Sequence, residues 1–194
     1  MTDAELIRRF RDGESQAFNG LVGRWHRRLY NFILRHVGDR EEAQDLCQKA
    51  FIRAYRNIRR LRHPEKFSSW LYQIAVNTCR DELRRRQRHP TLSLESLEQV
   101  ANGRPALKSS ASADARVHER DLRDLLNRAL QSIPEEQRVV VVMKEYEHLK
   151  FTEIAAALGL SVNTVKSRLY YGLNNLRKLL DQWDITRETI DDEV

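Results

Sequence analysis

Residues 150–180 constrain the fold more than any other stretch, because they contain two helical patterns separated by a tight turn. The small residue Ala155 lies on the apolar face of the first pattern and would let a second helix approach closely. Gly159 tolerates a positive φ angle, and Ser161 has a hydroxyl that suits the N-cap of the helix continued by Val165. This order of features predicts a helix-turn-helix.

The second helix of this motif carries polar side chains away from its apolar face. These residues are Asn163, Lys166, Ser167 and Tyr170. A helix of this kind can enter the major groove of DNA. The net charge of +6 favours a polyanionic partner, although an anionic membrane surface fits the same charge. We therefore expect DNA binding, and an ordinary packed helical hairpin is the alternative.

The N-terminal residues, up to position 89, predict a domain of four helices. Thr2 and Glu5 have the spacing of a capping box, so a short helix is expected to begin there. A second helix is expected from Ser15 to Gly38, and Asp39 has the spacing of an N-cap for a third. A fourth helix follows a loop around His63–Pro64. The apolar faces of these helices can pack together as a bundle.

Residues 90–116 are rich in Ser, Ala, Pro and Gly and lack a sustained apolar period, so we interpret them as a flexible linker. A coil of about 26 residues averages about 30 Å end to end and reaches at most about 90 Å. A second helical domain is expected over residues 117–183. Residues 184–194 are interpreted as an acidic tail that frays.

The run Val139–Val142 favours a strand by local propensity. It follows Ser132 and Pro134, which are typical of the first turn of a helix, and charged residues stand on both sides of it. We therefore expect a buried helix there. The predicted fold is all-α, with a four-helix N-terminal bundle and a C-terminal helix-turn-helix domain.

The remaining chemistry of the sequence is sparse. Cys47 and Cys79 lie in helical patterns without metal-ligand spacing, so reduced core residues are expected, with a disulfide or zinc site as the alternative. His26 and His36 are too far apart to share a metal and are expected at the surface or rim. No motif for a nucleophile, a metal or a phosphate loop is found, so we expect a non-enzyme without a cofactor. No apolar run approaches the length of a membrane-spanning helix, which is about 20 residues.

Two separated segments resemble the extracytoplasmic-function (ECF) sigma factors, the bacterial promoter-recognition subunits of RNA polymerase. The first comprises EEAQDLCQKAFIRAYRNI (41–58) and FSSWLYQIAVNTCRDELRRRQR (67–88). The second is the helix-turn-helix preceded by SIPEEQRVVVVMKEYEHL (132–149). The order of the segments matches the two-domain plan of that family. Lys49 departs from it, since Glu is usual after Asp-Leu-x-Gln, and this puts one polymerase contact in doubt.

The resemblance implies a polymerase-binding face on the third helix. Its residues are Asp45, Gln48, Lys49 and Ile52. The spacing of Asp45, Gln48 and Ile52 by three and four places them on one side of a helix, and the implied partner is the coiled-coil clamp of the largest polymerase subunit. Without the resemblance, a solvated helix face is the alternative interpretation.

The resemblance also implies recognition of the minus-ten promoter element by the first domain, at a loop over 61–67 and on the fourth helix. The expected contact residues are Arg62, His63, Lys66, Phe67, Asn77, Arg80 and Arg84. An Asn side chain can donate to and accept from the edge of an unstacked base. Two basic tracts, Arg53 to Lys66 and Arg80 to Arg88, can follow a phosphate backbone, although charge runs are often only solvated faces. Trp70 is expected in the core, with base stacking as its alternative role.

For the minus-thirty-five element, the family positions that face bases correspond to Lys166, Ser167 and Tyr170. Asn163, Thr164 and Arg168 are expected to hold phosphates near the start of the recognition helix. The implied partners are core RNA polymerase and promoter DNA, both duplex and unstacked non-template strand, with no small-molecule substrate and no membrane insertion.

The resemblance further implies a cytoplasmic protein that an anti-sigma factor holds inactive, in some cases at the membrane. The main rival is a helix-turn-helix activator that binds DNA without being a polymerase subunit. A third class, an enzyme acting on nucleic acid, would need a metal or nucleophile site.

Overall fold

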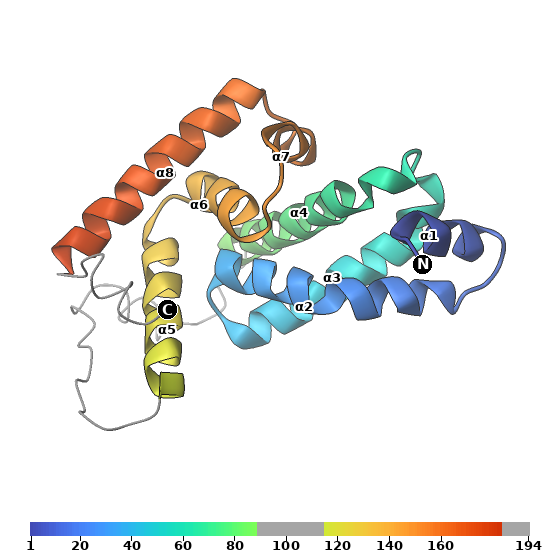
Figure 1. The fold of residues 1–194 in the computed structure, drawn as a ribbon, viewed down its shortest axis with the longest axis horizontal. Helices are drawn as coiled ribbons and strands as arrows, with labels where there is room; N and C mark the ends of the chain where they lie inside the picture. The colour runs from blue at the N-terminus through green and yellow to red at the C-terminus, as the bar shows by residue number, and fades with distance from the viewer. Residues whose placement is uncertain (89–114, 184–194) are drawn as a thin grey trace.

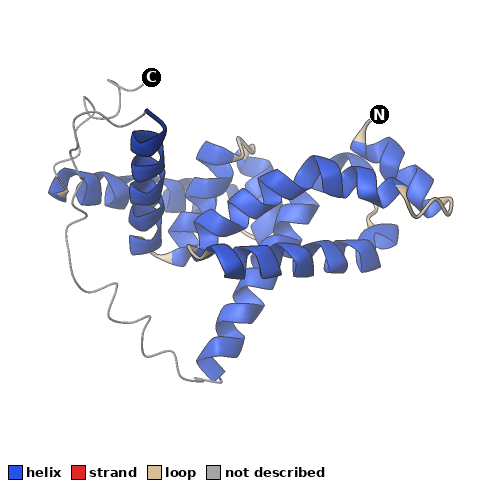
Figure 2. Cartoon of the chain, turned by 90° about the horizontal axis from the view of Figure 1, so that it is seen from below, coloured by secondary structure: helices blue, strands red, loops and turns tan. Residues whose placement is uncertain are grey.

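The computed structural model describes residues 1–88 and 115–183, and every regular element in these two ranges is a helix (Figures 1 and 2). The N-terminal part contains α1 (Asp3–Arg11), α2 (Ala17–Val37), α3 (Arg40–Asn57) and α4 (Phe67–Arg88), with short 3-10 turns at Ile58–Arg60 and Pro64–Lys66. The four predicted helices are confirmed. The second begins at Ala17, two residues after the predicted start.

The predicted helix caps of this part are present. Thr2 and Glu5 form the reciprocal capping box, and the Asp39 carboxylate accepts a hydrogen bond of 2.7 Å from the backbone N–H of Glu42. Gly38 ends α2 in the left-handed conformation, with φ of 85°. Buried side chains of α2, α3 and α4, such as Leu29 and Leu46, form the core of the bundle.

The C-terminal part contains α5 (Ala115–Ser132), α6 (Glu135–Val141), a π-helical turn at Val142–Tyr146, α7 (Phe151–Leu158) and α8 (Val162–Gln182). The run Val139–Val142 is helical and almost completely buried, as predicted. Of the predicted linker, 115 and 116 belong to α5 and the rest lies outside the described residues. The predicted acidic tail lies outside them as well.

The two parts pack directly against each other, and their buried side chains form one continuous cluster. Figure 1 shows α6 and α7 beside α2 and α4, although these helices are far apart in the sequence. Tyr72 of α4 and Met143 of the π-helical turn are both fully buried members of the cluster. The molecule is therefore a docked pair of helical domains.

The end of α2 shows how the docking is built. Its last carbonyl groups have no partner within the helix and lie at the negative end of the helix dipole. The amide of Gln131 donates to the Arg35 carbonyl at 2.9 Å, and the Arg138 guanidinium donates to the His36 carbonyl at 2.8 Å. Two side chains of the C-terminal domain thus cap a helix of the N-terminal domain.

Cys47 and Cys79 are buried and free, and burial raises the pKa of their thiols to about 11 and about 12. Both therefore remain neutral thiols near pH 7, in agreement with the predicted core role. Within the described ranges, none of the helices combines the length and apolarity that a bilayer crossing requires.

Candidate functional site

The helix-turn-helix consists of α7, a turn at Gly159 and α8. Gly159 has φ of 66°, and the Ser161 hydroxyl accepts a hydrogen bond of 3.0 Å from the backbone N–H of Thr164. Val165 is fully buried between the helices. At Gly172, a Cβ atom would lie only 2.8 Å from a methyl group of Val141, so glycine lets α8 cross α6 closely. The predicted helix-turn-helix is confirmed. The cap, the buried valine and the close crossing fix the orientation of α8 relative to α6 and α7.

The residues predicted to face bases lie on the exposed side of α8. Lys166, Ser167 and Tyr170 all project to solvent, and Tyr170 is 64% exposed. The Lys166 ammonium group lies 5.8 Å from the centre of the Phe151 ring, a cation–π contact with α7. These three side chains form a polar surface that can donate hydrogen bonds or accept them.

The residues predicted to hold phosphates differ in their availability. Asn163 is exposed, and its carbonyl accepts a hydrogen bond of 3.0 Å from Ser167. The Thr164 side chain is partly buried at the first turn. Arg168 is ion-paired with Glu136 of α6 at 2.7 Å, so its charge already has a partner within the chain.

The predicted contact residues Arg62, His63 and Lys66 of the loop over 61–67 are exposed, and His63 lies 3.0 Å from the Glu65 carboxylate. Phe67 is only 1% exposed, and its ring packs edge-on against Trp25 at 6.0 Å. Its predicted contact with DNA is therefore corrected, because in this structure the side chain supports the loop from within the core. Asn77 is exposed on α4. Trp70 is partly buried against the core, as predicted.

A cleft of about 340 Å³ separates this loop from α7. Its walls include Arg62, Lys66 and Trp70 of the first domain and Thr152 and Glu153 of the second. The loop over 61–67, which is predicted to contact the minus-ten element, therefore lies next to α7, the first helix of the helix-turn-helix.

The arginines of α4 are mostly paired within the chain. Arg80 lies 3.3 Å from the Glu135 carboxylate, whereas Arg84 has no carboxylate partner among the described residues. Arg80, Arg84 and Arg168 together line a second hollow of about 430 Å³. This brings predicted contacts for two different DNA elements to one place.

His36 was expected at the surface or rim, and this prediction was wrong. The side chain is 5% exposed and stacks on Phe32, one turn earlier on the apolar face of α2. Its Nε2 atom lies 3.5 Å from the Glu135 carboxylate. The hydrogen bond and charge interaction with His36, followed by the positive charge of Arg80, lower the pKa of Glu135 to about 2 against the opposing effect of burial. The apolar spacing of Leu29, Phe32 and His36 was the available signal for burial.

A second polar contact between the domains escaped the sequence analysis. The buried Tyr72 hydroxyl donates a hydrogen bond to the Glu147 carboxylate, which also lies 3.5 Å from Arg28. Burial and then the Glu147 contact raise the pKa of Tyr72 above its ordinary value. Nearby, the Arg35 guanidinium lies over the Tyr146 ring at 4.1 Å. These side chains stand among apolar residues in the sequence, and no local pattern indicates that they contact each other.

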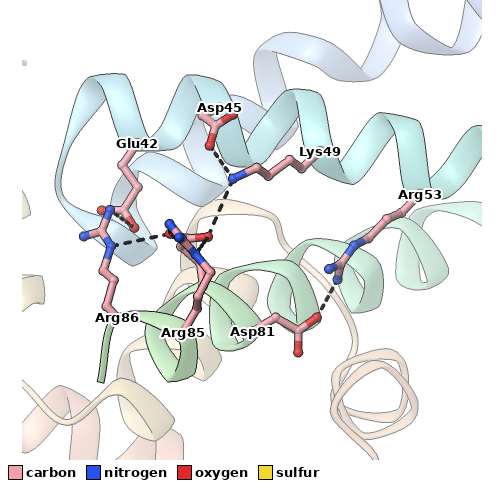
Figure 3. A network of polar contacts seen from close by, with 8 residues as sticks. Glu42, Asp45, Lys49, Arg53, Asp81, Arg85 and Arg86 are labelled. Carbon is pink, nitrogen blue, oxygen red and sulfur yellow. Dashed lines mark hydrogen bonds and ion pairs between the residues drawn. The ribbon is translucent and has the colours of Figure 1, made fainter. Parts of the chain in front are cut away.

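The predicted polymerase-binding residues occupy α3. Asp45, Gln48 and Ile52 project from its outer side, and Ile52 is 44% exposed although it is a large apolar residue. Lys49 is turned towards α4 and lies 2.6 Å from the Asp45 carboxylate (Figure 3). Asp45, Gln48 and Ile52 therefore form a mixed polar and apolar surface on the outer side of α3.

Comparisons with known proteins agree on one family. The sequence profile of Sigma-70 region 2 matches residues 21–89, and that of Sigma-70, region 4 matches residues 123–176. The RNA polymerase sigma-H factor of Pseudomonas aeruginosa is 33% identical over 92% of this chain and 93% of its own length. The ECF RNA polymerase sigma-E factor of Escherichia coli K12 is 33% identical over 88% of this chain and 90% of its own. The chain belongs to the ECF sigma factors.

In this sigma factor, region 2 extends from within α2 to just past the end of α4, and region 4 begins within α5 and ends within α8. The polar face of α3 and the loop over 61–67 fall in region 2. The recognition helix falls in region 4.

Solved structures show the same fold. CnrH, in a complex with the cytosolic domain of CnrY, superposes with a TM-score of 0.67 at 24% identity, over 93% of this chain and 97% of that chain. The sigma factor RpoE of Bartonella quintana, in a complex with the anti-sigma factor NepR, superposes with a TM-score of 0.65 at 22% identity, over 86% and 98% of the two chains. Both likenesses concern the arrangement of helices.

Proposed function

We propose that this sigma factor binds core RNA polymerase through α3 and directs it to promoters by contacting the minus-ten and minus-thirty-five elements. It would act in the cytoplasm, where the polymerase meets its template. One observation carries the proposal: region 4 contains a capped recognition helix, and region 2 of the same chain contains an exposed loop and an exposed Asn77 on α4.

At the minus-thirty-five element, α8 would lie in the major groove. Lys166 can donate to the acceptor atoms of guanine, and Ser167 can donate or accept. Tyr170 extends the same exposed side of the helix by one turn. Asn163 stands at the helix start, where backbone N–H groups and the helix dipole favour a phosphate.

At the minus-ten element, the loop over 61–67 would hold a base that has left the stack. Removing a base costs a few kcal/mol, so capture of the unstacked base stabilises melted DNA. The exposed amide of Asn77 can read a base edge, and the exposed cations Arg62 and Lys66 of the loop can bind phosphates.

Simultaneous contact with both elements requires the docked domains to separate. The positions minus thirty-five and minus ten are about 25 base pairs apart, which corresponds to about 85 Å of duplex at about 3.4 Å per base pair. In the docked arrangement, Lys66 of the loop and Thr152 of α7 line the same cleft. The predicted linker reaches about 90 Å when fully extended, which is enough for the separated state.

We further propose an anti-sigma partner for this chain. The two similar structures are complexes of CnrH with CnrY and of RpoE with the anti-sigma factor NepR. A partner that binds the docked state better than the separated state would keep the sigma factor inactive by shifting that equilibrium.

The test is reconstitution of transcription with purified core polymerase. The full chain should copurify with the core enzyme and give it promoter-specific initiation. Asn77→Ala should reduce initiation from a duplex promoter more than from a pre-melted one, because the pre-melted template no longer needs base capture to open. Equal loss on both templates would contradict the role of Asn77.

The same experiment separates the rival function. A helix-turn-helix activator that is not a polymerase subunit would bind DNA without core enzyme and would not copurify with it. Binding of promoter DNA alone, with no effect on start-site selection by core polymerase, would therefore refute the proposal.

A further inference from the structure

A ladder of ion pairs joins α3 and α4 along one side of region 2 (Figure 3). Glu42 pairs with Arg86 at 3.0 Å, Lys49 with Glu82 at 3.6 Å, and Arg53 with Asp81 at 2.7 Å. Each rung takes one side chain from α3 and one from α4.

The spacing of these residues divides α3 into two stripes. Positions 42, 49 and 53 are separated by seven and four residues, so they share the side that faces α4. Positions 45, 48 and 52 are separated by three and four residues and share the outer side, which is the proposed polymerase-binding face. Lys49 belongs to the inner stripe.

Lys49 is the point where the two stripes are connected. Its ammonium group lies 2.6 Å from Asp45 on the outer stripe and 3.6 Å from Glu82 on α4. The hydrogen bond with Asp45 is the main cause that raises the pKa of Lys49. The lysine therefore fixes the position of the Asp45 carboxylate relative to α4.

Glu82 explains why a cation stands at this place. Its side chain is only 10% exposed and is surrounded by Arg85 at 2.5 Å and Arg86 at 3.7 Å on its own helix. Hydrogen bonding with Arg85, together with the charge of Lys49, lowers its pKa, so it is ionised near pH 7. A carboxylate at position 49 would face both Glu82 and Asp45 and would be repelled by both.

We propose that Lys49 is a positioning residue of the polymerase-binding face, which aims Asp45 and braces α3 on α4 without touching polymerase itself. This inference rests on the proposed binding of core polymerase through α3. It assigns Lys49 and Glu82 to a coupled pair whose charges must remain opposite.

A double-mutant cycle with Asp45 tests the assignment. Lys49→Met should weaken binding of the full chain to core polymerase by about two- to fivefold and lower the thermal midpoint, because Asp45 and Glu82 lose the cation between them. In an Asp45→Asn background, Lys49→Met should change the affinity by less than about twofold, because a residue that acts through Asp45 then has no carboxylate to position.

The next rung supplies a matched control. Arg53→Met removes a cation from the same ladder one turn away and leaves Asp45 with its lysine. It should change the affinity for core polymerase by less than about twofold.

Each outcome decides the assignment. If Lys49→Met costs as much affinity in the Asp45→Asn background as in the original protein, Lys49 acts independently of Asp45, as a direct polymerase contact would, and the proposal is overturned. If Lys49→Met binds polymerase as tightly as the original protein, Lys49 positions nothing and the proposal is also overturned. If the original protein does not bind core polymerase, the proposed function fails first, and a lowered thermal midpoint of Lys49→Met then shows only a brace between the helices.

Discussion

The recognition helix α8 and the arginine-rich end of α4 use their charged side chains differently. On α8, Lys166 projects to solvent from a helix whose start is fixed by a capping hydroxyl and a buried valine. On α4, Arg80 and Arg85 are bound to carboxylates of the same chain. The number of arginines in a tract therefore does not measure the positive charge that is available to DNA.

The difference has a physical cause. A guanidinium is attracted more strongly to a largely buried carboxylate than to an exposed one, because the lower local dielectric screens the pair less. Glu82 and Glu135 supply such carboxylates on and opposite α4. The exposed side of α8 carries no comparable acid near Lys166 among the described residues. A docked second domain thus changes which cations of the first are free.

The largest effect is expected where the docking itself is broken. Glu147→Ala should lower the free energy of unfolding by about 1–3 kcal/mol, because it leaves the buried Tyr72 hydroxyl without its acceptor and Arg28 without its partner. Urea unfolding measures this. Glu145→Ala is the control, since Glu145 is exposed on the same turn. Similar losses in both variants would show that the buried contact is unimportant.

The recognition helix should respond in DNA specificity. Lys166→Ala is expected to weaken binding to a minus-thirty-five site by about tenfold, since a good base contact discriminates by about 1–3 kcal/mol. Binding to scrambled DNA should change much less. Lys178→Ala, on the exposed far end of α8, serves as the control. An equal loss on specific and scrambled DNA would assign Lys166 to a phosphate instead.

Arg84 and Arg85 allow an unpaired and a paired arginine on the same helix to be compared for their contributions to DNA binding. Arg84→Ala is expected to reduce the slope of log affinity against log salt by about 1, because one phosphate contact is lost. Arg85→Ala should change the slope less, since Glu82 already holds that guanidinium. Salt titrations of holoenzyme binding to promoter DNA measure both slopes. Equal changes would mean that the Arg85–Glu82 pair opens on DNA.

At Glu135 the expected effect is confined to acidic pH, as a dependence of stability on pH. Its pKa is about 2 in the folded chain and 4.5 ordinarily, so the unfolded chain takes up a proton first as the pH falls. The free energy of unfolding should therefore decrease from about pH 5 towards pH 2, whereas above about pH 5 the contribution is complete. Glu135→Gln should show a shallower decrease of the thermal midpoint over this range. Parallel curves for the two proteins would contradict the assignment.

Local features of the sequence predicted local structure well. Thr2, Gly38, Asp39 and Ser161 each mark a helix end that the structure contains, because capping depends on residues only three or four positions apart. The apolar spacing around Val165 predicted the helix-turn-helix for the same reason. Sequence patterns of this kind also placed Cys47, Cys79 and Trp70 in or against the core.

Contacts between the domains could not be predicted in the same way. Tyr72 and Glu147 are separated by 75 residues, and no sequence pattern near either residue predicts the contact with the other. The spacing of His36 from Phe32 indicated its burial, but its partner Glu135 reaches it from the second domain and could not be predicted. Phe67 was assigned by resemblance to a DNA-contacting loop, although its spacing of four from Leu71 fits a core position equally well.

The capped end of α2 has a consequence for hybrid proteins built from two sigma factors. The acceptors there are backbone carbonyls, which any sequence provides, whereas the donors are the side chains of Gln131 and Arg138. A hybrid that keeps the first domain of this chain and takes its second domain from a relative would retain the acceptors and could lose both donors. Introducing glutamine and arginine at those two positions is the smallest change that would restore the cap on α2 and thus the docking of the two domains in such a hybrid.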